Sequence, residues 1–335
     1  MRRRSRWWRR LRPHHRRPGA ACAADRAAHR RGHWNHDQEG GRLVSRDILT
    51  IADLEPGTLE TILDLSARAD LGRPLAGKGV ALVFQKPSAR TRNSMEMAAV
   101  QLGGHPVYIQ KDEVGLGTRE SAEDVARTLA CYHSVIAARV ADHGLLDRMA
   151  AAVEIPVLNM LSDSNHPLQA LADLLTIRQI AGKIEGVKIA WVGDANNVCR
   201  SLAEGCAALG AEMIIASPEG YGFAPAEADA LGIRQTVDPA EAVKGARFVY
   251  TDVWVSMGQD DEAAARREAL GTYSVDAELM ARTDDAWFLH CLPARRGEEV
   301  ADAVIDGPRS AVWRQAENRM HSARGAMAWM LGEAR

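Results

Sequence analysis

The sequence has few cysteines, few aromatic residues and no long hydrophobic run. Its 335 residues include five cysteines, none of them in a Cys-x-x-Cys arrangement. This argues against a disulfide framework and favours free thiols in a reducing compartment. No apolar run approaches the roughly 18 residues that a membrane-spanning helix requires. We therefore expect a cytoplasmic protein without membrane contact.

The net charge of −2 conceals an uneven distribution along the chain. Residues 1–43 hold thirteen arginines, no lysine and three acidic residues, a net charge of +10, which leaves −12 for the remainder. An acidic body is a poor match for nucleic acid, so we expect no nucleic-acid partner.

The basic segment 1–43 also lacks the apolar core of a secretory signal. A transit peptide, a nucleic-acid arm or a metal site at Cys22, His29, His33 and His36 are possible interpretations of its composition. We favour a disordered or untranslated extension, because its composition is biased and shows no apolar period.

The length predicts two domains. Beyond residue 43, short apolar runs alternate with helical patterns, which is typical of α/β architecture. We predict two doubly wound domains, each with a mainly parallel central sheet flanked by helices. The predicted strands are 79–84, 106–109, 135–138, 157–160, 187–192, 213–216, 248–251 and 287–289, and the main helices are 58–69, 91–102, 168–180 and 312–330.

A Ser-Ala-Arg-Thr-Arg segment at 88–92 joins the first predicted strand to a helix. The start of a helix offers unpaired N–H groups and a positive dipole end, and arginine side chains match phosphate oxygens. A capped surface helix with solvated arginines is the alternative, but the position directly after a buried strand favours a phosphate site. The triphosphatase loop Gly-x-x-x-x-Gly-Lys is absent.

Other polar segments also follow predicted strands. His166 and Gln169 open an apolar helix, where His166 could equally be a buried structural residue. Asn197 follows a Gly-Asp-Ala-Asn turn that lacks the Gly-x-Gly-x-x-Gly of dinucleotide sites, and an N-capped turn is the alternative. Asp252 and Cys291 come after the last two strands, at the sheet edge where open α/β sheets bind ligands. A surface loop and a buried small hydrophobe are the alternatives.

In this order, the segments 88–92, 166–169, 252–258 and 290–294 resemble the aspartate/ornithine carbamoyltransferase family, and among its members the ornithine carbamoyltransferases. The resemblance spans about residues 44–332. It implies transfer of the carbamoyl group of carbamoyl phosphate to the δ-amine of L-ornithine, giving L-citrulline and phosphate, without metal or organic cofactor. It also implies a homotrimer or an assembly of trimers.

The resemblance further implies a division of the chain. Residues 44–178 would bind carbamoyl phosphate, with a C-terminal helix at 310–332 packing back on them, and residues 179–309 would bind ornithine. The carbamoyl phosphate site implied is Ser88, Ala89, Arg90, Thr91, Arg92, Arg139, His166, Gln169, Cys291, Leu292 and Arg319. The ornithine site implied is Asn197, Asp252, Ser256 and Met257.

Four residues are implied to be catalytic. Arg139 and His166 would stabilise the charge that develops on the carbonyl oxygen. Asp252 and Cys291 would position and deprotonate the attacking amine, so the rate would rise with pH through a group near Cys291. The phosphate dianion would lie between Arg139 and the two arginines of segment 88–92.

The sequence departs from the family pattern twice. Ala89 stands where the family has a hydroxyl-bearing residue, a loss of about 1 kcal/mol for one hydrogen bond. Gly115 falls where the family has a glutamine that contacts the substrate. The alternatives are a carbamoyltransferase for another amine, such as putrescine or an N-acylated ornithine, a non-catalytic relative, or a nucleotide-dependent oxidoreductase.

Overall fold

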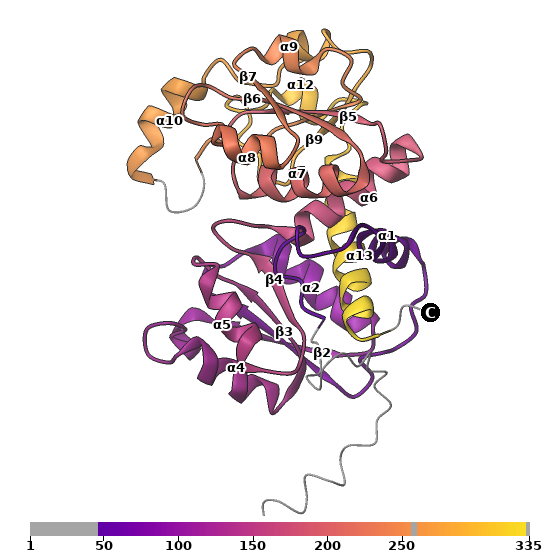
Figure 1. Ribbon diagram of the computed structural model, residues 1–335, viewed down its shortest axis with the longest axis vertical. Coiled ribbons are helices and arrows are strands. Elements are labelled where there is room, and N and C mark those ends of the chain that lie inside the picture. The colour runs from indigo at the N-terminus through magenta and orange to yellow at the C-terminus, as the bar shows by residue number, and fades with distance from the viewer. Residues whose placement is uncertain (1–45, 256–259, 333–335) are drawn as a thin grey trace, which may run out of the picture. The chain divides into compact units, whose positions relative to one another are not determined.

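The computed structural model describes residues 46–255 and 260–332 (Figure 1). The predicted extension 1–43 lies outside the described residues, as do Ser256 and Met257. Within the described ranges, no helix is both long and apolar enough to cross a membrane.

The first half of the chain forms a four-stranded parallel sheet in the order β2-β1-β3-β4. Its central strand β1 is a continuous apolar run that is buried along nearly its whole length, as expected when helices cover both faces of a parallel sheet. The strands are β1 Gly79–Phe84, β2 His105–Gln110, β3 His133–Arg139 and β4 Val157–Leu161. The helices of this half are α1 Pro56–Ala67, α2 Ala89–Gln101, α3 Lys111–Val114, α4 Ala122–Ala130 and α5 Gly144–Ala152.

The second half repeats the architecture with five parallel strands in the order β7-β6-β5-β8-β9. The strands are β5 Lys188–Val192, β6 Glu212–Ala216, β7 Arg234–Thr236, β8 Phe248–Tyr250 and β9 Trp287–Leu289. The helices are α7 Asn197–Leu209, α8 Pro225–Ala230, α9 Pro239–Val243, α10 Ala263–Leu270, α11 Ala277–Met280 and α12 Asp302–Ile305, with a short 3₁₀ turn η2 at Asp260–Glu262. The predicted class of two parallel α/β units is therefore confirmed.

Two long helices complete the fold, α6 Pro167–Ala181 and α13 Val312–Met330. In α6, every residue from Pro167 to Ile177 is buried, which marks it as a central helix rather than an amphipathic surface helix. It packs against both α7 and α13, and α13 also packs against α1 and α2 (Figure 1). These helices therefore join elements that are distant in the sequence.

Helices α13 and α1 approach each other closely at Gly325. A Cβ atom built on this glycine would lie 2.6 Å from the backbone nitrogen of Ser66 and 2.8 Å from its Cα. Backbone atoms cannot move aside as a flexible side chain can, so only glycine fits in this contact.

We predict that Gly325→Ala destabilises the protein by about 2 kcal/mol through overpacking, although alanine is the better helix former. The matched control is Gly57→Ala in α1, where a Cβ atom meets nothing within 4 Å, so that it should be neutral or stabilising. Denaturant unfolding of both variants is the measurement. Equal stability of the two variants would contradict the close packing of α13 on α1.

Candidate active site

The polar segments singled out in the sequence follow the carboxyl ends of parallel strands, where open α/β sheets bind ligands. Together they line a cavity of about 820 Å³. The predicted site residues among its lining are Ser88, Ala89, Arg90, Thr91, Arg139, His166, Asn197, Asp252, Cys291, Leu292 and Arg319.

One wall of the cavity is the start of helix α2. Ser88 is the N-cap, and its hydroxyl oxygen accepts a hydrogen bond from the backbone nitrogen of Thr91 at 3.3 Å. Ala89 occupies the first helical position and is exposed, so the hydroxyl it lacks is missing at the cavity itself. The unpaired N–H groups and positive dipole of the first turn make this wall suited to an anion.

The guanidinium groups of Arg90, Arg139 and Arg319 reinforce this preference for an anion. Arg139 is 5% exposed and Arg319 is 6% exposed. Burial, followed by the positive charges of Arg319 and Arg90, lowers the pKa of Arg139 to about 10. None of the carboxylates in the described ranges pairs with Arg90, Arg139 or Arg319. Buried cations without a counter-charge repel one another, so a bound dianion would stabilise this wall.

His166 lies beside these arginines as a neutral imidazole. Burial, followed by the charges of Arg319 and Arg139, lowers its pKa well below the usual range. The Nη1 atom of Arg319 lies 3.5 Å from Nε2 of His166, and an arginine can only donate. Nε2 is therefore the acceptor, so Nδ1 carries the proton, and Nδ1 is buried without a partner.

Gln169 lies behind this wall. It is completely buried and is not part of the cavity lining. Its Oε1 accepts a hydrogen bond from Arg319, which also donates to Oγ1 of Thr91 at 3.0 Å. Gln169 thus holds Arg319 in place rather than facing the cavity directly.

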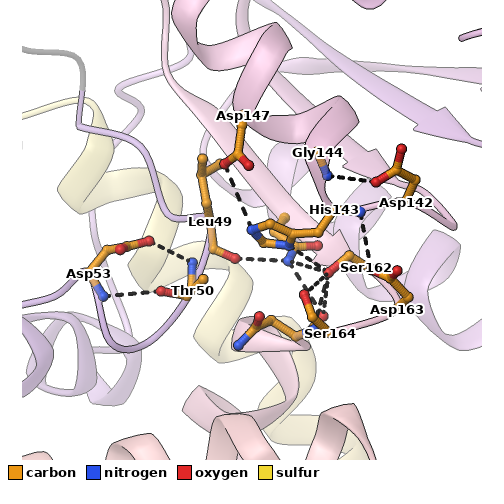
Figure 2. Close-up of polar contacts among 12 residues, drawn as sticks. Leu49, Thr50, Asp53, Asp142, His143, Gly144, Asp147, Ser162, Asp163 and Ser164 are labelled. Carbon is orange, nitrogen blue, oxygen red and sulfur yellow. Dashed lines mark hydrogen bonds and ion pairs between the residues drawn. The ribbon is translucent and has the colours of Figure 1, made fainter.

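The loop between β4 and α6 is anchored by a cluster of hydrogen bonds around Ser162 (Figure 2). The Oγ atom of Ser162 lies 2.8 Å from Nδ1 of His143, and Oδ1 of Asp163 accepts from the backbone nitrogen of His143 at 3.1 Å. These bonds tie the loop that precedes His166 to the loop that follows Arg139. Arg139, at the end of β3, and His166, at the start of α6, are therefore held at a fixed separation.

The opposite wall is formed by the second sheet. The Sγ atom of Cys291 donates to Oδ1 of Asp252 at 3.0 Å, and Asn196 donates to the other carboxylate oxygen at 2.8 Å. Nδ2 of Asn197 donates to the carbonyl oxygen of Ser162 at 2.6 Å. Asp252 is 7% exposed and accepts only from neutral donors, so it is suited to pair with a cationic ligand.

The surroundings of Cys291 disfavour its thiolate form. Burial, followed by the charge of Asp252, raises the pKa of its thiol well above the usual range. The thiol is therefore protonated at neutral pH and acts as a donor to Asp252. A rate that rises with pH cannot depend on ionisation of this thiol near neutrality, and Asp252 is the group placed to accept a proton.

Leu292 adopts a left-handed backbone conformation with φ 61°, and its N–H donates to Nδ1 of His290 at 2.9 Å. Such conformations cost free energy in non-glycine residues and are common at functional sites. Asp252, His290 and Cys291 bring possible metal-ligand atoms within 4.8 Å of one another. Nε2 of His290, however, pairs with Glu299 at 3.1 Å, so this ring has no nitrogen free for a metal.

Arg92 was predicted to contact carbamoyl phosphate, and Gly115 is one of the two departures from the family pattern. Arg92 is absent from the lining; its Nε atom pairs with Glu96 at 2.8 Å and its guanidinium lies 4.0 Å from the ring centre of Tyr108. Gly115 ends α3 in a left-handed conformation with φ 63°, and a Cβ atom there would lie 2.7 Å from that of Arg119. A glutamine would therefore not fit at residue 115 in this loop.

Residues that the sequence did not reveal also line the cavity. Arg266 of α10 pairs with Asp194 at 2.9 Å, and both side chains are 12% exposed. Arg266 lies in a run of alanines and charged residues without a motif, so no local signal pointed to it. Asn196 is the N-cap of α7, and its position beside Asn197 was the available signal.

We predict that the thiol of Cys291 reacts with iodoacetamide much more slowly at pH 8 than that of Cys131, which is exposed. Alkylation requires the thiolate, and burial and Asp252 disfavour it at Cys291. Peptide mass spectrometry over time measures both rates. Removal of the neighbouring charge by Asp252→Asn should accelerate the reaction of Cys291 and leave Cys131 unchanged. A rate at Cys291 that does not respond to this variant would contradict the contact between them.

Comparison with known proteins gives consistent matches along the chain. A model of the aspartate/ornithine carbamoyltransferase carbamoyl-P binding domain matches residues 46–179, and a model of the Asp/Orn binding domain matches residues 185–330. The chain is 47% identical over 311 residues to an ornithine carbamoyltransferase of Hyperthermus butylicus, covering 87% of this chain and 99% of that protein.

Two further relatives agree. An anabolic ornithine carbamoyltransferase of Pyrococcus furiosus is 43% identical over 309 residues, covering 87% of this chain and 98% of that protein. The crystal structure of ornithine carbamoyltransferase from Thermus thermophilus is 41% identical, with a TM-score of 0.80, and the match covers 86% of this chain and 99% of that one.

Proposed function

The chain belongs to the aspartate/ornithine carbamoyltransferase family, and from this membership we propose that it is an ornithine carbamoyltransferase. In this reaction, the carbamoyl group of carbamoyl phosphate passes to the δ-amine of L-ornithine, and L-citrulline and phosphate are released. The anabolic relative supports a role in arginine biosynthesis.

One observation supports the proposal most strongly. The cations Arg90, Arg139 and Arg319 line the cavity together with the start of α2, and the uncompensated carboxylate Asp252 lines it from the second sheet. Carbamoyl phosphate is a dianion and ornithine carries ammonium groups. The charge of each wall therefore matches the charge of one substrate.

The first half of the reaction is binding and polarisation of carbamoyl phosphate. Its phosphate oxygens would accept from the first turn of α2 and from Arg90, while the carbonyl oxygen would lie beside Arg139 and His166, with Arg139 donating to it. These donors are in place before the reaction, so they stabilise the negative charge that develops on this oxygen without reorganisation.

The second half is attack by the amine. The neutral δ-nitrogen of ornithine forms a bond to the carbonyl carbon, and the carbonyl π pair moves to oxygen. When the tetrahedral intermediate collapses, the carbon–oxygen bond to phosphate breaks and phosphate leaves with that electron pair. The nitrogen loses its proton to Asp252 or to the departing phosphate. The thiol of Cys291 orients the carboxylate of Asp252 by donating to it.

The proposal extends to features for which the support is the family resemblance. We assign residues 44–178, with the C-terminal helix 310–332, to carbamoyl phosphate, and residues 179–309 to ornithine. Packing of α13 against α1, α2 and α6 supports the first assignment. A homotrimeric assembly, a cytoplasmic location and ornithine contacts by Ser256 and Met257 belong to the same proposal.

We predict that the purified protein forms citrulline from carbamoyl phosphate and L-ornithine. Putrescine and N-acetylornithine should react much more slowly, because neither presents both the free α-ammonium and the α-carboxylate. Colorimetric detection of the ureido product measures all three amines. Asp252→Asn should lower kcat/KM for ornithine by about 10²–10⁴-fold, the usual range for loss of a general base. If putrescine or N-acetylornithine reacted faster than ornithine, that amine would be the assigned substrate instead.

Two arginines of segment 88–92 provide a matched pair for testing the phosphate site. We predict that Arg90→Gln raises KM for carbamoyl phosphate by about 10-fold or more, since a hydrogen bond to a charged group contributes about 1.5–3 kcal/mol. Arg92→Gln should change this KM little, because Arg92 pairs with Glu96 outside the cavity. Steady-state kinetics at saturating ornithine separates them, and equal effects would argue against the anion site described here.

A further inference from the structure

A buried carboxylate lies behind both walls of the cavity. Asp173 of α6 is completely buried. Its Oδ1 accepts hydrogen bonds from Nε2 of Gln169 at 2.8 Å and from Nε2 of Gln315 at 2.6 Å, and its Oδ2 accepts from the hydroxyl of Tyr250 at 3.1 Å. These partners come from α6, α13 and β8. Asp173 does not line the cavity and has no part in the mechanism proposed above.

Each glutamine bound to Asp173 is held in one of its two amide orientations. Gln169 places its NH₂ group against a carboxylate oxygen and its Oε1 against Arg319, which can only donate. Gln315 places its NH₂ group against the same oxygen, and its Oε1 accepts from the backbone N–H of His290 at 2.9 Å. Turning either amide over would put oxygen against oxygen and N–H against N–H. Asp173 therefore favours both orientations, and for Gln315 it does so together with the hydroxyl of Tyr250, which accepts from the same Nε2 at 2.9 Å.

Gln169 and Gln315 connect Asp173 to the two walls of the cavity, each of which is assigned to a different substrate. Through Gln169 the connection ends at Arg319, one of the three cations on the phosphate wall. Through Gln315 it ends at His290, the residue before Cys291, which donates to Asp252 on the amine wall. A single oxygen atom, Oδ1 of Asp173, is thus the shared acceptor of both connections.

We propose that Asp173 is a positioning residue that orients Gln169 and Gln315, and through them holds Arg319 and the Cys291 segment in the geometry required for carbamoyl transfer. This inference rests on the proposed function. It requires an acceptor oxygen at the position of Oδ1, not a negative charge.

The ionisation of Asp173 fits this requirement. Burial raises its pKa to about 7, against the opposing effect of its hydrogen bonds to Gln169, Gln315 and Tyr250. A proton on Oδ2 would leave Oδ1 free to accept from both glutamines, and the hydroxyl of Tyr250 would then accept from Oδ2 instead of donating to it. The same arrangement is available to an asparagine, whose side chain has the same shape and one acceptor oxygen.

The decisive comparison is between two substitutions of similar size. Asp173→Asn keeps an acceptor and should stay within about fivefold of the wild-type kcat/KM for both substrates, the scale of one lost hydrogen bond. Asp173→Leu removes the acceptor and should lower both values by about 100-fold, as small misplacements of catalytic groups do. Equal losses in the two variants would overturn the proposal, because charge rather than geometry would then be the requirement.

Thr176→Val is the matched control. Thr176 is also completely buried on α6, and its hydroxyl oxygen accepts from Asn318 of α13 at 2.8 Å. Its hydroxyl also donates to the carbonyl oxygen of Ala172, and within the described residues it makes no hydrogen bond to Gln169, Gln315 or the cavity lining. Its loss should therefore lower stability and leave both kinetic constants nearly unchanged. If Thr176→Val lowered kcat/KM as much as Asp173→Leu, loss of packing in α6 would explain both results. Asp173 would then be a structural residue and the proposal would be overturned.

A second variant covers the case in which Asp173→Leu does not fold. Gln315→Met cuts only the connection to His290, so KM for ornithine should rise by about 10-fold, the cost of an unpaired buried N–H group. KM for carbamoyl phosphate should stay the same. A change in both constants, or in neither, would contradict the two separate connections.

A measurement without catalysis distinguishes failure of this inference from failure of the proposed function. The side-chain amide resonances of Gln169 and Gln315 should exchange slowly with solvent in the wild type and in Asp173→Asn. In Asp173→Leu the amide of Gln169 should lose this protection. In Gln315→Met the amide of Gln169 keeps its acceptor and should stay protected. Absence of citrulline formation by the wild type would sink the proposed function, whereas unprotected amides in Asp173→Asn would sink the inference.

Discussion

Repulsion among three guanidinium groups is the constraint on which the site depends. Arg90, Arg139 and Arg319 share a cavity wall, and no carboxylate in the described part of the chain forms an ion pair with them; the buried Asp173 attracts Arg319 only from behind the wall. Unpaired buried ions cost several kcal/mol each, so the fold must hold them against this cost. Thr91 and Gln169 accept hydrogen bonds from Arg319, which keeps that cation oriented. A dianion that binds at this wall relieves the repulsion among the cations, so its binding is favourable and stabilises the folded protein.

Holding such charges together requires a rigid frame, and the parallel sheet provides it. Arg139 pairs in register with Phe84, the last residue of the adjacent strand β1, four residues before Ser88. Both lie at the same edge of the sheet because parallel strands end together. The central helices α6 and α13 then carry His166 and Arg319 to that edge. The cations are thus positioned by backbone elements rather than by mobile side chains alone.

The sequence predicts those features of the fold and site whose signal lies in neighbouring residues, and it does not predict features that depend on distant contacts. Strand β1 was predictable because an unbroken apolar run is typical of a parallel strand buried on both faces. Strand β7, Arg-Gln-Thr, has no such apolar run. It is a strand because it pairs with β6, and the local sequence carries no signal of that pairing. Arg92 was predicted to face the phosphate together with Arg90, but residues two apart on a helix point to different sides. The Asp173 network could not be predicted, because it joins distant residues: Asp173 and Gln315 alone are 142 positions apart.

The two aspartates near the amine wall show how neighbouring groups of one chemical type take different roles. Asp194 pairs with Arg266 inside the protein, so its charge is already compensated and a substrate ammonium gains little from it. Asp252 accepts from Asn196, Cys291 and its neighbouring backbone N–H, all of them neutral. Neutral donors fix the direction of a carboxylate without cancelling its charge. The carboxylate that meets the substrate is therefore oriented by the protein, and its pairing with a cation is left to the ligand.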